Sequence, residues 1–166
     1  MGRASVKDNK SIYQLTREEL KLTREKASEM TGFMSPEHIE KIENGKINVQ
    51  PDDVMALAEC YKAPKLCNYY CSNECPIGEK YIPEVQVKDL AQIAIETLNS
   101  LNRINREKDR LLEIIEDGKV TDDEISDFVS IKKTFDKISL SVNTLQLWVD
   151  QAIADGNLDR SIFDDQ

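Results

Sequence analysis

Hydrophobic residues in the first 72 positions recur every three or four residues within five short segments. This spacing predicts five amphipathic helices separated by tight turns. The first helix begins at Ile12, the second follows Thr23, the third follows Ser35, and the last two begin at Pro51 and Pro64. With the two long helical segments described below, the expected fold class is all-α.

The boundaries of the third segment are the clearest in this part of the chain. Ser35 is a helix-capping residue, and Pro36 occupies the first helical position, where its missing amide hydrogen costs nothing. Asn44 and Gly45 are expected to end this helix, because glycine tolerates a left-handed backbone. The pattern therefore predicts a short, well-delimited helix over residues 36–43.

Two long amphipathic segments follow residue 87 and predict an antiparallel helical hairpin. Each arm runs ~25–35 residues, or roughly 40–50 Å at 1.5 Å per residue. At the turn, Thr121 and Glu124 have the spacing of a capping box, Val120 and Ile125 that of a hydrophobic staple, and Gly118 closes the first arm. The expected apolar stripes are Leu90, Ala94, Thr97, Leu101, Ile104, Lys108, Leu111 and Ile115 on the first arm, and Ile125, Phe128, Ile131, Phe135, Ile138, Val142, Leu145 and Val149 on the second.

The chain therefore divides into three expected parts. Residues 1–72 form a five-helix head, residues 73–87 form a connector rich in Cys and Pro, and residues 88–166 form the hairpin. Neither arm can bury its stripe alone, so each must pack on the other arm, on a second copy, or on both. We expect a homodimer; a hairpin that only completes a monomer, or that serves as a platform for a partner, is the alternative.

Composition and charge narrow the classes of protein that fit. The chain has 166 residues, and no apolar run approaches the ~20 residues that cross a bilayer. The first dozen residues lack the apolar stretch of a secretory signal, so we expect a cytoplasmic protein that does not contact a membrane. Of the net charge of −9, residues 1–75 contribute almost nothing, with 11 Lys and Arg against 12 Asp and Glu. A nucleic-acid partner is therefore expected to meet the head.

The segments LTREKASEMTG and IEKIENGK, with the following LAECY, resemble the Cro/lambda-repressor-like helix-turn-helix family of the xenobiotic-response-element type. The resemblance covers residues ~10–72. It implies a transcriptional regulator, expected to be a repressor, that binds double-stranded DNA in a sequence-specific manner. It also implies that the third helix enters the major groove, with its first turn nearest the base edges.

The resemblance also supplies candidate DNA contacts. On the third helix, opened by Ser35, the base-facing positions are Pro36, Glu37 and His38, with Glu40 and Lys41 behind them. Phosphate contacts fall to Thr23, Arg24 and Lys46, since helix amino termini and cations suit phosphate.

Two features depart from the family pattern. One extra residue, Phe33 or Met34, is expected in the turn before the third helix, and glutamates stand at positions 37 and 40, where the family usually has Arg, Gln, Ser or Thr. Glutamate can accept a hydrogen bond from cytosine, but it weakens the electrostatic part of DNA binding. The helix either reads a site containing cytosine or meets a protein, as in an adaptor or an antitoxin-like interaction module.

All four cysteines fall within one short window that joins the head to the connector. The spacing is C-x6-C-x3-C-x3-C, over Cys60, Cys67, Cys71 and Cys75. Four thiolates suit zinc or an iron–sulfur cluster, although the tight C-x2-C pairs of zinc ribbons are missing. Reduced thiols packed as small hydrophobic groups, or a redox-sensing pair, are the alternatives.

No arrangement of residues points to catalysis. The chain has one histidine, no glycine-rich phosphate loop, and no nucleophile paired with a base. The acidic stretch DGKVTDDE lacks the alternating oxygen ligands of a calcium loop and fits the hairpin turn better. We therefore expect a protein that is not an enzyme.

Overall fold

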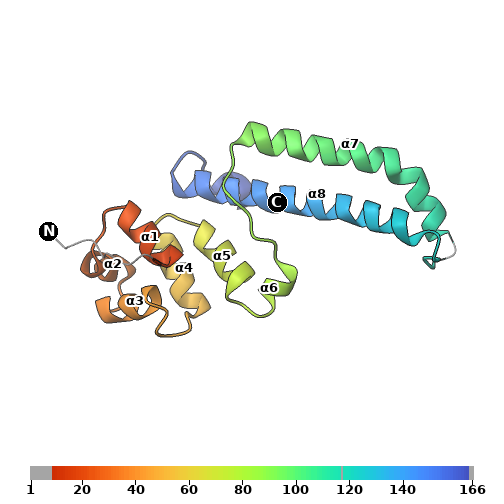
Figure 1. Cartoon of the computed structure of the whole chain (residues 1–166). Coiled ribbons are helices and arrows are strands. Elements are labelled where there is room, and N and C mark those ends of the chain that lie inside the picture. Colours follow the sequence, from red (N-terminus) through yellow and green to blue (C-terminus); the bar gives the residue numbers. More distant parts are fainter. Residues whose placement is uncertain (1–8, 117, 165–166) are drawn as a thin grey trace. The chain divides into compact units, whose positions relative to one another are not determined.

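The computed structural model describes residues 9–116 and 118–164, and within them the chain forms nine helices and no strand (Figure 1). The expected all-α fold class is therefore confirmed. None of the described helices is both long and apolar enough to span a bilayer. The helices are α1 (Ile12–Glu19), α2 (Arg24–Thr31), α3 (Pro36–Glu43), α4 (Pro51–Cys60), α5 (Lys65–Asn73), α6 (Gly78–Tyr81), α7 (Leu90–Ile115), α8 (Ile125–Ala154) and α9 (Ser161–Asp164).

The chain forms two compact units. One contains the residues up to Glu84 together with those from Asp150 onward, and the other contains Val85–Val149. The first unit holds the five-helix head together with the last residues of α8 and helix α9, and the second holds the rest of the hairpin. Residues 73–84 of the expected connector, including helix α6, group with the head. Residues 1–8, 117 and 165–166 of the expected parts lie outside the described residues.

The predicted caps of the head helices are present. The Thr23 hydroxyl accepts a hydrogen bond from the Lys26 amide at 3.2 Å, and the Ser35 hydroxyl accepts one from the His38 amide at 3.2 Å. Gly45 follows the end of α3 with a φ of 63°, the left-handed conformation expected there. Local sequence chemistry therefore fixes both ends of α3 independently of tertiary contacts.

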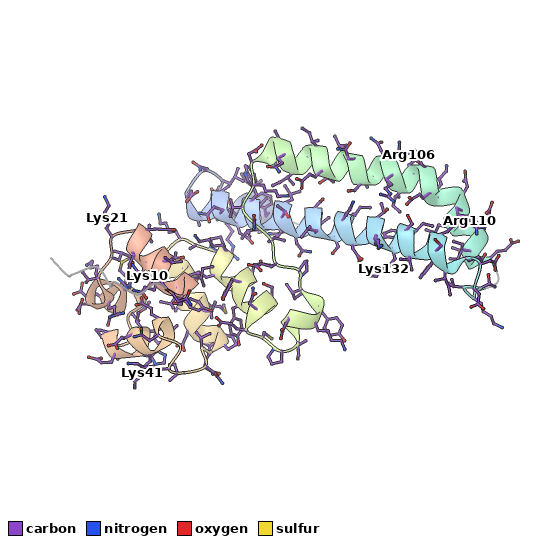
Figure 2. All side chains as sticks on the ribbon, viewed as in Figure 1. Lys10, Lys21, Lys41, Arg106, Arg110 and Lys132 are labelled. Atoms are coloured by element: carbon purple, nitrogen blue, oxygen red, sulfur yellow. The ribbon has the colours of Figure 1, made fainter. Side chains whose placement is uncertain are left out.

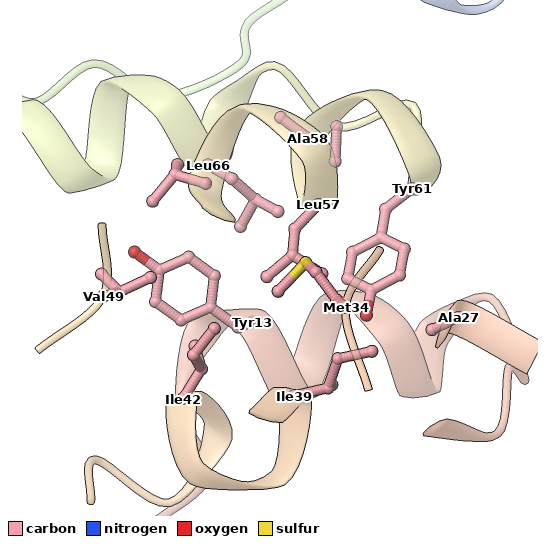
Figure 3. Close-up of a cluster of buried hydrophobic side chains, with 12 residues drawn as sticks. Tyr13, Ala27, Met34, Ile39, Ile42, Val49, Leu57, Ala58, Tyr61 and Leu66 are labelled. Atoms are coloured by element: carbon pink, nitrogen blue, oxygen red, sulfur yellow. The ribbon is translucent and has the colours of Figure 1, made fainter. Parts of the chain in front are cut away.

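One apolar core holds the head together (Figure 3). Ile39 and Leu57 are fully buried at its centre, and Tyr13 and Tyr61 enclose them. Met34, from the turn between α2 and α3, is also buried, whereas its neighbour Phe33 is exposed. Of the two residues proposed as the extra one, Met34 thus contributes to the core.

A buried ion cluster lies beside this core. The Glu43 carboxylate on α3 is only 1 % exposed and receives two hydrogen bonds from Arg17 on α1, at 2.6 and 3.0 Å. A third comes from Arg24 on α2 at 2.9 Å. These bonds join three helices, because a buried carboxylate is stable only when its charge and lone pairs are satisfied. The guanidinium of Arg17 also donates to the Leu22 carbonyl at 2.6 Å.

The hairpin unit pairs α7 with α8 in antiparallel order (Figure 1). Arg110 donates to Asp127 at 2.7 Å, Arg103 to Ser130 at 3.0 Å, and Thr134 to Glu107 at 3.2 Å. At the turn, the Thr121 amide donates to the Glu124 carboxylate at 3.0 Å, which is half of the predicted capping box. These three hydrogen bonds between the arms fix which residues of α7 and α8 lie opposite each other.

The stripes predicted for the hairpin are only partly buried, and this corrects the expectation. The buried residues of the unit are Val85, Ile93, Ser100, Ile114, Ile131, Thr134, Ser141, Thr144 and Leu147. Several predicted members are exposed instead: Leu90, Leu101, Ile115, Phe135, Val142 and Leu145. The buried hydroxyls bond to the carbonyl four residues earlier, as Ser141 does to Lys137 at 3.0 Å, so these small polar side chains are satisfied although they are buried.

Candidate nucleic-acid interface

Helices α2 and α3 present the features of a groove-reading pair. They are joined by a four-residue turn over 32–35, in which Gly32 adopts a φ of 78°. Ile39, Ile42 and Glu43 are buried on the inner side of α3. This packing leaves Glu37 and Lys41, one helical turn apart, exposed on its outer side.

The amino terminus of α2 holds two of the predicted phosphate contacts. The exposed Thr23 uses its hydroxyl to cap α2, and its side chain therefore lies beside the free amides of the first turn. Arg24 keeps about a third of its side chain exposed while its Nε bonds to Glu43. Because Arg24 is held in one orientation, less side-chain entropy is lost if it also contacts a phosphate.

The glutamates of α3 are all engaged within the head. Glu43 belongs to the buried cluster, and Glu40 accepts hydrogen bonds from Lys46 at 3.2 Å and Asn44 at 3.3 Å. The Lys46 contact lowers the pKa of Glu40. Hydrogen bonds from its own backbone amide and from the Ser35 hydroxyl lower the pKa of Glu37, so this carboxylate supports the start of α3. Cations therefore offset the charge of Glu40 and Glu43, whereas Glu37 stays charged and exposed.

His38 has a structural partner that the sequence did not reveal. Its Nε2 lies 3.0 Å from an Oδ2 oxygen of Asp53, which is also 3.5 Å from the Gln50 amide at the start of α4. The histidine therefore ties α3 to α4, although 38 % of its side chain stays exposed. In the sequence, Pro51-Asp52-Asp53 indicates the start of α4. Nothing in the local sequence indicates that Asp53 pairs with His38.

Two lysines of the head have exposed side chains. Lys41 is exposed in the last turn of α3, and Lys21 is exposed in the turn before α2 (Figure 2). Lys21 adopts a φ of 56°, unusual for a residue with a side chain.

The four cysteines are free and half-buried. Among the residues that the structure describes, no group of three or more His, Cys, Asp or Glu side chains is arranged to hold a metal ion. Burial raises the pKa of the Cys60 and Cys67 thiols, which disfavours the thiolate that binds metals. Both pack against the head core. This geometry favours packed thiols, and metal binding stays an untested prediction.

The α2–turn–α3 pair gives the compact helical head the arrangement of a helix-turn-helix. Residues 14–64 match the helix-turn-helix family of the lambda-repressor/Cro-like type, which confirms the resemblance for the head and supports a DNA-binding regulator. No curated protein and no solved structure shows significant similarity to the chain. The hairpin lies outside the matched residues, so any function assigned to it rests on its own geometry.

Proposed function

We propose that this protein is a sequence-specific DNA-binding transcriptional regulator that acts as a repressor by occupying an operator. It works by binding rather than by catalysis. The observation that carries the proposal is the capped α2–turn–α3 pair, with α3 exposed along one side, within the residues that match the helix-turn-helix family. In such pairs the second helix lies in the major groove.

The charges of the head support this orientation. We expect Arg24 at the start of α2, Lys41 on α3 and Lys46 after α3 to contact phosphates beside the groove, because all three are cations near the α2–α3 pair. Glu37 remains exposed in the first turn of α3, where it can accept a hydrogen bond from a cytosine amino group. We therefore expect an operator half-site with a G·C pair at the position that Glu37 reads.

The protein is proposed to act as a homodimer. One small head makes few phosphate contacts, whereas two linked heads gain affinity through effective concentration when they bind paired half-sites. An operator with inverted half-sites is the expected consequence.

The exposed Glu37 also favours a second candidate function, in which α3 contacts a protein. A carboxylate in the first turn of a DNA-facing helix is repelled by phosphate, whereas it suits a basic protein surface. An adaptor or antitoxin-like interaction module on the same fold would have this property.

Selection from random genomic fragments separates the two candidates. The protein is incubated with the fragments at low salt, and the bound DNA is sequenced after washes of increasing salt. A sequence-specific regulator enriches a few fragments and loses affinity steeply as salt rises. Failure to retain DNA at any salt concentration would refute the regulator and favour the interaction module. A Glu37→Gln variant that selects a different base at one position would identify the contact made by Glu37.

A further inference from the structure

The hairpin unit leaves several large apolar side chains exposed beside the buried residues of α7 and α8. On α8, Phe135 is 48 % exposed and Val142 is 57 % exposed, while the adjacent Thr134 and Ser141 are buried. On α7, Leu101 is exposed beside the buried Ser100. Burial of apolar rather than polar area drives association in water, so the hairpin alone leaves much of its driving force unused.

The exposed apolar residues follow the heptad spacing of helices that pack on further helices. On α7 the positions alternate by four and three residues, and on α8 they lie seven, seven and three residues apart. Sustained alternation of this kind is typical of coiled-coil and bundle contacts. We call these residues the exposed seam: Ala94, Leu98, Leu101, Asn105, Lys108, Leu112 and Ile115 on α7, and Phe128, Phe135, Val142 and Leu145 on α8.

Both halves of the exposed seam lie on one face of the hairpin. On α7, Leu101 follows the buried Ser100 by one residue; on α8, Val142 follows the buried Ser141 by one residue. One residue is a rotation of about 100° around a helix. The helices α7 and α8 run antiparallel. A step of one residue toward the carboxyl end therefore turns away from their line of contact to the same side on both helices. The exposed row of α7 and the exposed row of α8 thus face the same side of the hairpin. The seam is thus one surface built from two helices.

The area of this face matches that of a stable dimer. Eight large apolar side chains of the seam are 37–59 % exposed. Large apolar side chains have on the order of 100–200 Å² of surface, so these eight leave roughly 400–800 Å² uncovered. A homodimer contact removes about 800 Å² from each partner, of which about 65 % is apolar. The same face of a second copy would therefore cover the apolar area that the exposed seam leaves in contact with water.

We propose that two copies of this chain associate through the exposed seam, so that two α7–α8 hairpins form a four-helix bundle. The two-fold axis makes the same surface meet itself, as in most dimers. Asn105 and Lys108 interrupt the apolar rows once on α7, and single polar positions of this kind fix register and oligomeric state. The inference deepens the homodimer of the proposed function, but it does not rest on DNA binding.

Molar mass in solution, measured by light scattering on the full chain without DNA, tests the proposal. The wild type is expected at twice the chain mass of 18.9 kDa at micromolar concentration. Val142→Glu would bury a carboxylate in the seam and is expected to weaken the dimer at least about 100-fold. Leu112→Glu on α7 should do the same. Far-UV circular dichroism checks that both variants keep their helices.

Val129→Glu provides the matched control. Val129 is an exposed valine on the same helix, about 140° around it from Val142. This variant should remain dimeric. A monomeric wild type would overturn both the bundle and the homodimer, whereas a dimer that tolerates Val142→Glu and Leu112→Glu would overturn the seam alone. Neither result bears on DNA binding, which the fragment selection tests separately.

Discussion

Replacement of Glu43 by glutamine is predicted to destabilise the head strongly. The change removes the charge that faces two guanidinium groups and places amide hydrogens against the N–H groups of Arg17, which lies 2.6 Å away. The Arg17 side chain is only 8 % exposed, so water cannot replace the lost partner. Removal of one partner from a buried ion pair costs ~3–5 kcal/mol. In a domain of this size, each kcal/mol corresponds to roughly 4–8 °C in Tm.

Urea unfolding followed by the near-ultraviolet signal of tyrosine measures this loss in the head. All five tyrosines lie before Glu84, and the single tryptophan, Trp148, lies in the other unit. Glu19→Gln is the matched control, because Glu19 forms an exposed pair with Lys65 at 3.5 Å. Exposed pairs contribute about 0–1 kcal/mol.

A second variant distinguishes a buried charge from simple loss of packing. Arg17→Met combined with Glu43→Leu removes both charges, and such apolar replacements are often neutral or stabilising. We expect the double variant to be more stable than Glu43→Gln. If Glu43→Gln cost no more than Glu19→Gln, the claim that this cluster joins α1, α2 and α3 would be refuted.

Three further predictions concern the head. Tyr61→Phe should leave the free energy of unfolding unchanged or slightly raised, because the buried Tyr61 hydroxyl has no hydrogen-bond partner among the described residues. Tyr13→Phe should cost about 1–2 kcal/mol, because it removes the 3.0 Å bond to Glu74. Equal effects of the two variants in urea unfolding would contradict this. Gly78→Ala should cost about 1–3 kcal/mol of unfolding free energy in the same assay, because a Cβ there would lie 2.0 Å from the Cys71 carbonyl oxygen. An unchanged urea midpoint would contradict this and show that α6 can shift to accommodate the methyl group. Metal analysis of anaerobically purified protein should find no stoichiometric zinc or iron, in the wild type or in Cys71→Ser; one equivalent that is lost in the variant would establish the thiolate site instead.

The sequence predicted the head helices because their limits are encoded locally. Thr23, Ser35 and Gly45 each determine a helix end through their own chemistry, and the structure has those ends at the predicted residues. The contacts within the head were less accessible. The pairs Arg17–Glu43 and His38–Asp53 join residues 26 and 15 positions apart, and no periodicity specifies such partners.

The hairpin shows a different limit. Its helices and turn followed from periodicity and capping, but the face that meets the other arm did not. Apolar periodicity marks residues that avoid water without stating which surface covers them. Thr134 and Ser141 are buried against expectation, and Phe135 and Val142 are exposed. In the sequence, an apolar stripe that contacts two neighbouring helices has the same three- and four-residue spacing as a stripe that contacts only one.

The salt dependence of operator binding by lysine variants tests the central claim most directly, once an operator has been selected. Lys41→Gln changes a cation on α3, and Lys132→Gln changes an exposed lysine on α8, with both positions marked in Figure 2. If α3 lies in the groove, the slope of log K against log salt should fall by about 1 for Lys41→Gln and stay unchanged for Lys132→Gln. Equal slopes for the wild type and Lys41→Gln would contradict the proposed binding mode.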